Sequence, residues 1–215
     1  IAACSRPVWD SDWRAAAADW RSLGHPSPPV LLTVCNRTET AARVEHYLAK
    51  GHTHWPELHA PERTLRVDSR VLDKAELGEI AGTDKDYEAK LKAIVEAAAI
   101  PGERKLRVAA LTKEELPREM VDNGGKAGTI GQDLQSVVSV AMLSEGWDAK
   151  NVTHIMGLRA FTSQLLCEQV IGRGLRRSDH TDLTQPEYVD VYGVPFQLLP
   201  FAKASGAKPI APPKV

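Results

Sequence analysis

The chain has 215 residues, of which 43% are hydrophobic and 26% are charged, and its formal net charge is −1. These values are ordinary for a globular protein, and the length suits one sizeable domain with extensions. No apolar run approaches the roughly 20 residues that span a bilayer, so neither a transmembrane helix nor a membrane partner is expected. Because DNA-binding domains usually carry a basic surplus, any nucleic-acid contact is expected to be local and weak.

The cysteines and histidines carry no pattern of a disulfide framework or a metal centre. Cys4, Cys35 and Cys167 are far apart in the sequence and form no CxxC pair, so the expected compartment is a reducing cytoplasm. His52 and His54 have the spacing of a ligand pair, but no third ligand follows at a familiar distance, and no metal site is predicted. The first residues contain neither an initiator methionine nor a signal-peptide pattern, so we expect the chain to be part of a longer polypeptide.

Residues 1–28 are predicted to be an N-terminal helical extension and linker. Three tryptophans have the spacing of one face of a short helix over Asp12 to Leu23, and we expect this face to pack against the domain. The proline-rich stretch from His25 to Pro29 is predicted to be the linker. The tryptophans are Trp9, Trp13 and Trp20.

Residues 29–200 are predicted to form one α/β domain. The apolar run from Val30 to Cys35 is typical of a buried strand, and the helix expected after it carries Ala41, Val44 and Leu48 on one face. Strands alternating with helices predict a mostly parallel sheet flanked by helices. The further predicted strands are Thr64–Val71, Lys105–Leu111, Ser136–Leu143, Val152–Leu158 and Tyr188–Tyr192, and the further predicted helices are Asp84–Ala99 and Thr162–Arg177.

Three other expectations concern single segments. The strand from Ser136 to Leu143 has the strongest apolar character and is predicted to be central in the sheet. The glycines between Gly124 and Gly131 are predicted to form a flexible loop. The tail over 201–215 is rich in proline, alanine and lysine and is predicted to be mobile.

The segment after the central strand is a candidate ligand-binding turn. In open α/β sheets ligands bind beyond the carboxyl ends of the strands. Gly146 there would let the backbone approach a ligand, and Asp148 would supply a carboxylate two residues later. An ordinary turn with a capping aspartate explains this fragment equally well.

The following helix carries a basic stripe. At about 100° per residue, Gln169, Arg173 and Arg176 share one face, without an acidic partner among them. Two glycines, Gly172 and Gly174, each cost roughly 1 kcal/mol relative to alanine in a helix interior, which indicates close packing or the end of the helix. The stripe is either a solvated basic face or a cluster directed at phosphates, whose oxygens match the arginine fork. Apolar or small residues occupy the opposite face, namely Cys167, Val170, Ile171 and Gly174.

These two segments resemble conserved motifs of superfamily 2 helicases. The run from Gln169 to Arg177 is similar to motif VI, Q-x-x-G-R-x-x-R, and the run from Met142 to Asp148 is similar to motif V in its E-G-x-D form. Their order and separation also fit. The longer run from Gly157 to Arg177 resembles the helicase part of type III restriction Res subunits, as does the stretch from Tyr188 to Phe196.

The resemblance implies the second RecA-like lobe of a DNA helicase or translocase. ATP and Mg²⁺ would be held mainly by a first lobe of the same polypeptide, and neither is expected to bind tightly to this chain. Further implied partners are DNA and a restriction-modification subunit. Arg173 and Arg176 would be arginine fingers acting on the γ-phosphate. Gln169, Gly146 and Asp148 would face the nucleotide or the contact between lobes, and Ser144, Glu145, Asn36 and Arg37 would contact nucleic acid.

The sequence lacks the residues with which such enzymes hold the phosphates. It contains no G-x-x-x-x-G-K-[ST] motif and no Asp-Glu pair of the DEAD type, so the chain alone is expected to be inactive as an ATPase. Two other functions stay open. One is a non-catalytic interaction or regulatory domain that retains the helicase-lobe fold, and the other is an unrelated nucleotide-binding α/β domain.

Overall fold

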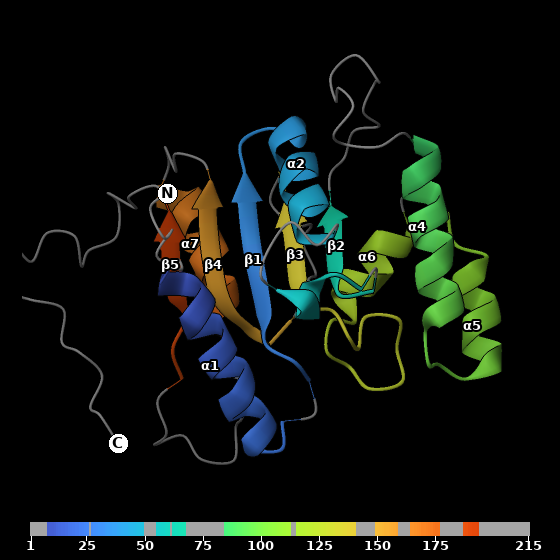
Figure 1. The fold of residues 1–215 in the computed structure, drawn as a ribbon, viewed down its shortest axis with the longest axis horizontal. Coiled ribbons are helices and arrows are strands. Elements are labelled where there is room, and N and C mark those ends of the chain that lie inside the picture. Colours follow the sequence, from blue (N-terminus) through green and yellow to red (C-terminus); the bar gives the residue numbers. More distant parts are fainter. Residues whose placement is uncertain are drawn as a thin grey trace, which may run out of the picture.

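Helices and strands are interspersed along the described chain (Figure 1). The computed structural model describes residues 8–25, 27–49, 55–60, 62–67, 84–112, 115–140, 149–158, 164–176 and 187–193. The strands are β1 (Val30–Cys35), β2 (Thr64–Val67), β3 (Ser136–Ser139), β4 (Val152–Leu158) and β5 (Asp190–Gly193). The helices are α1 (Val8–Ser22), α2 (Thr38–Ala49), α4 (Asp84–Ala97), α5 (Gly102–Ala109), α6 (Glu115–Asp122) and α7 (Gln164–Gly174), with a 3₁₀ turn η1 (Pro56–Leu58).

The strands form one sheet in the order β2-β3-β1-β4-β5, and every neighbouring pair is parallel. The chain is therefore an α/β protein with a parallel sheet flanked by helices, as predicted, and this arrangement is consistent with a RecA-like lobe. The strand beginning at Ser136 was predicted to be central, and β3 lies inside the sheet between β2 and β1, next to the middle strand. β1 is the middle strand and hydrogen-bonds to β3 and β4.

Both faces of the sheet are covered, which explains why β1 is apolar at every position except Thr33. All six of its residues are buried. Leu31 and Cys35 point to the face covered by α1 and α2, where they join one core cluster. Val30 and Val34 point to the other face, where the second cluster joins α4, α5, α6 and α7. A strand buried on both sides cannot alternate apolar and polar residues, as the sequence pattern had indicated.

The N-terminal helix α1 packs on the sheet face over β4 and β5 (Figure 1). The predicted packing of its tryptophans is confirmed for Trp13, which is 1% exposed and lies 6.0 Å from the ring of Trp55. The hydroxyl of Tyr192 in β5 donates a hydrogen bond to Asp12 Oδ2 over 2.6 Å, which connects α1 to the last strand. Trp20 lies further along and stacks on His25, and the side chain of Trp9 falls outside the described residues.

A charged cluster joins α2 and α4 to strand β2. Glu45 of α2 is 8% exposed and accepts a hydrogen bond from Lys90 of α4 over 2.5 Å. Lys90 also donates to the carbonyl of Thr64, and the Nε of Arg66 lies 3.6 Å from the Glu45 carboxylate. Two cations around one buried carboxylate offset the cost of removing it from water. The cluster therefore joins α2, α4 and β2, which are far apart in the sequence.

One predicted strand is wrong. Lys105–Leu111 lies mostly in helix α5, and α6 was not predicted at all. The alternation of Leu106 and Val108 resembles a strand, but Val108 alone of the two is buried, while Leu106 is 76% exposed. Two other predicted strands extend into 68–71 and 141–143, which lie outside the described residues, as does the tail over 201–215.

The glycine-rich segment before β3 is a series of hydrogen-bonded turns, not an open loop. The amide of Gly125 donates to the carbonyl of Gly131 over 2.9 Å. Gly125 has a φ of +76°, and a Cβ there would lie 2.5 Å from Asn151 Nδ2 and 2.6 Å from Ser27 Cβ. This position requires glycine for both conformation and space. No helix among the described residues has the length and apolar character needed to cross a bilayer.

A buried histidine lies beneath α1. His154 of β4 is 1% exposed, and its Nδ1 lies 2.9 Å from Thr153 Oγ1. Its Nε2 lies 3.7 Å from Asp190 Oδ2, and its ring is nearly parallel to that of Tyr192. Burial lowers the pKa of His154 below its ordinary value of 6.5, while the carboxylates of Asp190 and Asp12 oppose this shift.

This burial predicts that acid destabilises the fold through His154. The folded chain binds the imidazole proton less readily than the unfolded chain. The stabilising contribution is therefore complete above pH 6.5 and is lost as the pH falls toward the lowered pKa. Urea unfolding should show the free energy of unfolding falling as the pH is lowered from about 7 to about 5, and falling less in His154→Gln.

The same pair of proteins supplies the control. Above about pH 7.5 the imidazole is neutral in both states, so the two pH profiles should run parallel there. Equal losses of stability between about pH 7 and 5 in wild type and His154→Gln would contradict the assignment.

Candidate functional site

Helix α7 carries the basic stripe and connects β4 to β5 across the sheet face that holds the larger core cluster. Its inward side chains are anchored in that cluster. Cys167 is 1% exposed, Val170 3% and Ile171 8%. The predicted apolar face is therefore confirmed, and its packing in the core helps to hold the helix on the sheet.

The three predicted stripe residues lie away from this buried face. Gln169 is exposed, and Arg173 and Arg176 are half-buried. The helix is shorter than predicted and ends at Gly174, so Arg173 lies in its last turn and Arg176 just beyond it. A cation in the last turn also interacts favourably with the negative end of the helix dipole, and this is a structural role for Arg173.

The electrostatic surroundings of Arg173 are those of a partly desolvated cation. Burial lowers the pKa of Arg173 from its ordinary value, and the neighbouring Arg176 lowers it further. The carboxylate of Asp122, at the end of α6, acts in the opposite direction. Two guanidinium groups held near one another at a half-buried position create a local positive potential, which is the property required to bind phosphate oxygens.

The end of α7 lies where the chain enters the sheet. Gly174 is adjacent to Val189, the residue before β5, so Arg173 and Arg176 lie toward the amino edge of the sheet. Two hydrogen bonds of Asn151 stabilise that edge. The side-chain amide of Asn151 donates to the carbonyl of Pro28 over 2.8 Å, and Val30 donates its backbone N–H to the Asn151 carbonyl over 2.7 Å.

The candidate nucleic-acid residues after β1 lie at the opposite edge. Asn36 and Arg37 follow the carboxyl end of β1 directly, and both are exposed. Thr40 of α2 donates a hydrogen bond to Asn36 Oδ1 over 3.4 Å. The structure therefore does not bring these two residues together with Arg173 and Arg176, because strands of the sheet separate the two groups.

The motif V candidates cannot be located. Ser144, Glu145, Gly146 and Asp148 all lie outside the described residues. The described chain stops at Val140, past the carboxyl end of β3, and resumes at the buried Ala149, before the amino end of β4. The predicted proximity of Gly146 and Asp148 to the stripe therefore stays a prediction.

The described residues contain no group of three or more His, Cys, Asp or Glu side chains that could hold a metal ion. His59 is among them, and His52 and His54 are not. A cavity of about 380 Å³ lies among α4, α5 and α6. Figure 1 shows α4 and α5 beyond the β2 edge of the sheet, at the opposite end from β4 and β5. The walls of the cavity are mainly Leu91, Val95, Val108, Leu111 and Leu116, and it holds none of the candidate site residues.

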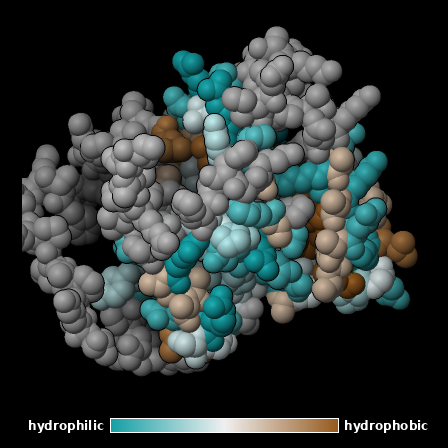
Figure 2. Space-filling view, in the orientation of Figure 1, coloured by the Kyte–Doolittle hydropathy of each residue, from teal (hydrophilic) through white to brown (hydrophobic). Residues whose placement is uncertain are grey.

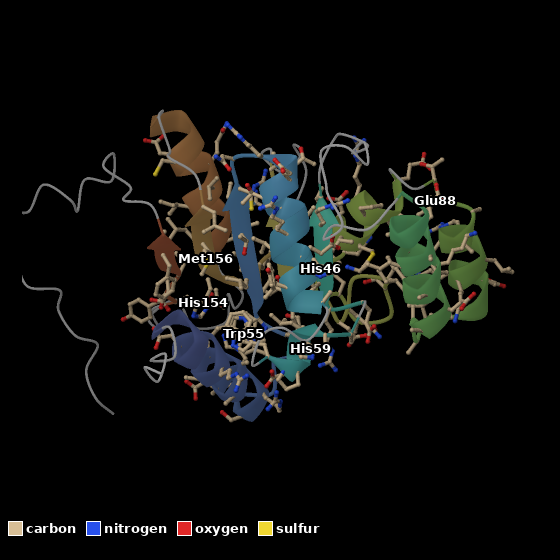
Figure 3. The ribbon with its side chains drawn as sticks, turned by 45° about the horizontal axis from the view of Figure 1, so that its top comes forward. His46, Trp55, His59, Glu88, His154 and Met156 are labelled. Carbon is tan, nitrogen blue, oxygen red and sulfur yellow. The ribbon has the colours of Figure 1, made fainter. Side chains whose placement is uncertain are left out.

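Two groups of polar residues escaped the sequence analysis. Figure 3 shows His154 beside α1 and near Trp55. His154 and Tyr192 could have been found only from the pairing of β4 with β5, which no local pattern reveals. Glu45 carried a weak signal, since it is a charged residue next to the apolar face of α2.

Comparison with known proteins adds no assignment: no family model matches the chain, nor does any curated protein or solved structure.

The two faces of α7 should differ sharply in their importance for folding. Ile171→Ala should lower the free energy of unfolding by about 2–5 kcal/mol, because it leaves a cavity in the core. Gln169→Ala, two residues away and exposed, should change it by less than about 0.5 kcal/mol. Urea unfolding of the chain measures both. A loss of stability in Gln169→Ala comparable to that of Ile171→Ala would mean that the stripe is structural.

Proposed function

We propose that this chain is the second RecA-like lobe of an ATP-dependent DNA helicase or translocase of the type III restriction Res group. The proposal is supported by the resemblance of two segments to motifs V and VI, in the right order. It is also supported by the all-parallel sheet that carries the second of these segments on a helix packed against it.

The observation that carries the proposal is the division of α7 into two faces. Its core side is secured by Val170 and Ile171, while Arg173 and Arg176 are kept at a half-buried position outside the core. The apolar face packs the helix on the sheet. The burial of the two arginines limits their rotamers, which prepares the two guanidinium groups to meet a ligand with little further ordering.

In the proposed enzyme the first lobe holds the triphosphate and Mg²⁺, which neutralises charge on the β- and γ-phosphates. Arg173 and Arg176 would donate hydrogen bonds to the γ-phosphoryl oxygens while a water oxygen bonds to the γ-phosphorus and the bond to the β-phosphate oxygen breaks, which releases ADP and phosphate. Gln169 faces the nucleotide or the first lobe from the same helix. Closure of the two lobes brings the phosphates to these residues, so hydrolysis depends on the relative position of the lobes.

The nucleic acid is proposed to contact the other edge of the sheet. Asn36 and Arg37 there are exposed, and the N-terminus of α2 begins one residue later, which favours an anion. Ser144 and Glu145 are proposed to extend this contact. DNA is thus bound at the carboxyl edge and the phosphates of ATP toward the amino edge, with the rigid sheet between them.

The alternative is an interaction or regulatory domain that keeps the fold without the chemistry. Such a domain has no need of Arg173 and Arg176, so their replacement separates the two functions.

Removing either arginine should abolish turnover without unfolding the lobe. In the full-length enzyme that contains this lobe, Arg173→Ala or Arg176→Ala should reduce kcat for DNA-stimulated ATP hydrolysis by roughly 10³-fold or more. ADP affinity should change little, since the lost contact forms mainly in the transition state. The Arg→Lys variants should not recover activity, because an ammonium cannot reproduce the fork.

Arg107→Ala is the matched control, because Arg107 is an exposed arginine on the distant helix α5. It should leave kcat unchanged. Near-normal ATPase activity in Arg173→Ala and Arg176→Ala would reject the arginine-finger assignment and favour the non-catalytic alternative.

Arg37→Ala should weaken binding of single-stranded DNA to the chain. With a net charge of −1 the chain should bind through few phosphates, and the dependence of log K on log salt should be shallow. Losing one phosphate contact should reduce that slope by about 1. The control is Arg43→Ala, since Arg43 lies further along α2 and pairs with Glu39 over 3.5 Å. A fluorescence titration at several salt concentrations measures both, and an identical effect of the two variants would reject Arg37 as a contact.

A further inference from the structure

The two glycines of α7 differ in what surrounds them. A Cβ on Gly172 would meet no atom within 4 Å. A Cβ on Gly174 would overlap the Cγ2 of Val189 and would lie 3.1 Å from its Cβ and 3.2 Å from Ile155 Cδ1. Glycine weakens a helix wherever it occurs. Only at Gly174 do contacts within the described part of the chain explain the presence of a glycine.

The reason for glycine at 174 is space and not backbone conformation. Gly174 is not among the glycines with a positive φ, and the helical ladder continues past it, because Leu175 donates its N–H to the Ile171 carbonyl over 3.1 Å. An alanine could adopt this backbone. It could not fit, because the contacting atoms belong to a β-branched side chain and to the core strand β4.

This contact determines where the end of α7 lies. Val189 is part of the rim of the larger core cluster, and Ile155 is fully buried in it. A methyl group at 174 would therefore push the last turn of α7 outward, because the core side cannot give way easily. Arg173 is in that turn and Arg176 follows it by two residues, so both guanidinium groups would move with it.

We propose that Gly174 is a positioning residue for the arginine fingers, acting through its contact with Val189. The inference rests on the proposed function, since it concerns the reaction in which Arg173 and Arg176 are proposed to act. Gly174 touches neither nucleotide nor metal. It allows the end of α7 to pack closely against Val189, which leads into β5. This close packing sets the position of both arginines, from which they reach the γ-phosphate when the lobes close.

The test is the preference of the full-length enzyme for a transition-state mimic. The affinities of Mg-ADP and of Mg-ADP with aluminium fluoride are measured by calorimetry, and their ratio does not depend on the fraction of folded enzyme. Gly174→Ala should reduce this ratio by at least about tenfold, because misplaced arginines weaken binding of the mimic alone. ADP affinity should stay within about twofold.

A second substitution at the contact tests the mechanism. In Gly174→Ala, the further change Val189→Ala removes the overlapping Cγ2 and should recover most of the lost preference. Val189→Ile, which enlarges the side chain that packs against Gly174, should lower the preference in the same direction and less strongly than Gly174→Ala. This variant provides a result if Gly174→Ala does not fold. Gly102→Ala is the control, because a Cβ at Gly102 on α5 meets no atom within 4 Å.

The outcomes separate this inference from the proposed function. Loss of the preference in Arg173→Ala but not in Gly174→Ala or Val189→Ile would overturn the positioning role alone. An unchanged preference in Arg173→Ala and Arg176→Ala would overturn the proposed function as well. An equal loss of affinity for ADP and for the mimic in Gly174→Ala would show that the glycine serves only folding, which also contradicts the inference.

Discussion

The structure depends on the parallel pairing of all its strands. A parallel strand can be reached only by a connection that returns across one face of the sheet, and among the described crossovers the helices α2, α4, α5, α6 and α7 cover the two faces in this way. β1, in the middle, is thereby buried on both sides and carries apolar residues on both. Each covering helix must present one apolar face and is free to use the other. In α7 the face opposite the apolar one carries the arginines. The path of the crossover brings the last turn of the helix toward the amino edge of the sheet.

The same path separates the two proposed contacts. Arg37 follows a strand and lies at the carboxyl edge, whereas Arg173 ends a returning helix and lies toward the amino edge. In the proposed enzyme, DNA and nucleotide are therefore linked through a packed sheet and not through a shared pocket. Figure 2 shows hydrophilic and apolar residues side by side over the described part of this face. Coupling between DNA binding and hydrolysis would then follow from movement of the whole lobe.

Sequence patterns predicted most reliably the strands in which most residues are buried. The bounds of β1 and β4 agree with their predicted bounds, because each strand is a mostly buried run that contains several β-branched residues. α5 was predicted as a strand because its short amphipathic pattern, with Leu106 exposed, fits either period. The order of the strands and the contact of Gly174 with Val189 could not be predicted, since both depend on which segments meet in space. The stripe on α7 was predictable from spacing alone, while its position at the amino edge was not.

The central claim is that the end of α7 meets the nucleotide when the lobes close, and a distance measurement tests it most directly. Leu175 is 63% exposed and lies between the two arginines, so a spin label on Leu175→Cys reports on this turn. Cys35 and Cys167 are buried, and Cys4 is replaced by serine. With Mn²⁺ in place of Mg²⁺ in the full-length enzyme, the account predicts strong broadening of the label spectrum when ATP analogue and DNA are both bound. A label on Leu106→Cys of α5 should be unaffected. Equal spectra at 175 with and without the Mn²⁺-nucleotide and DNA would contradict the account.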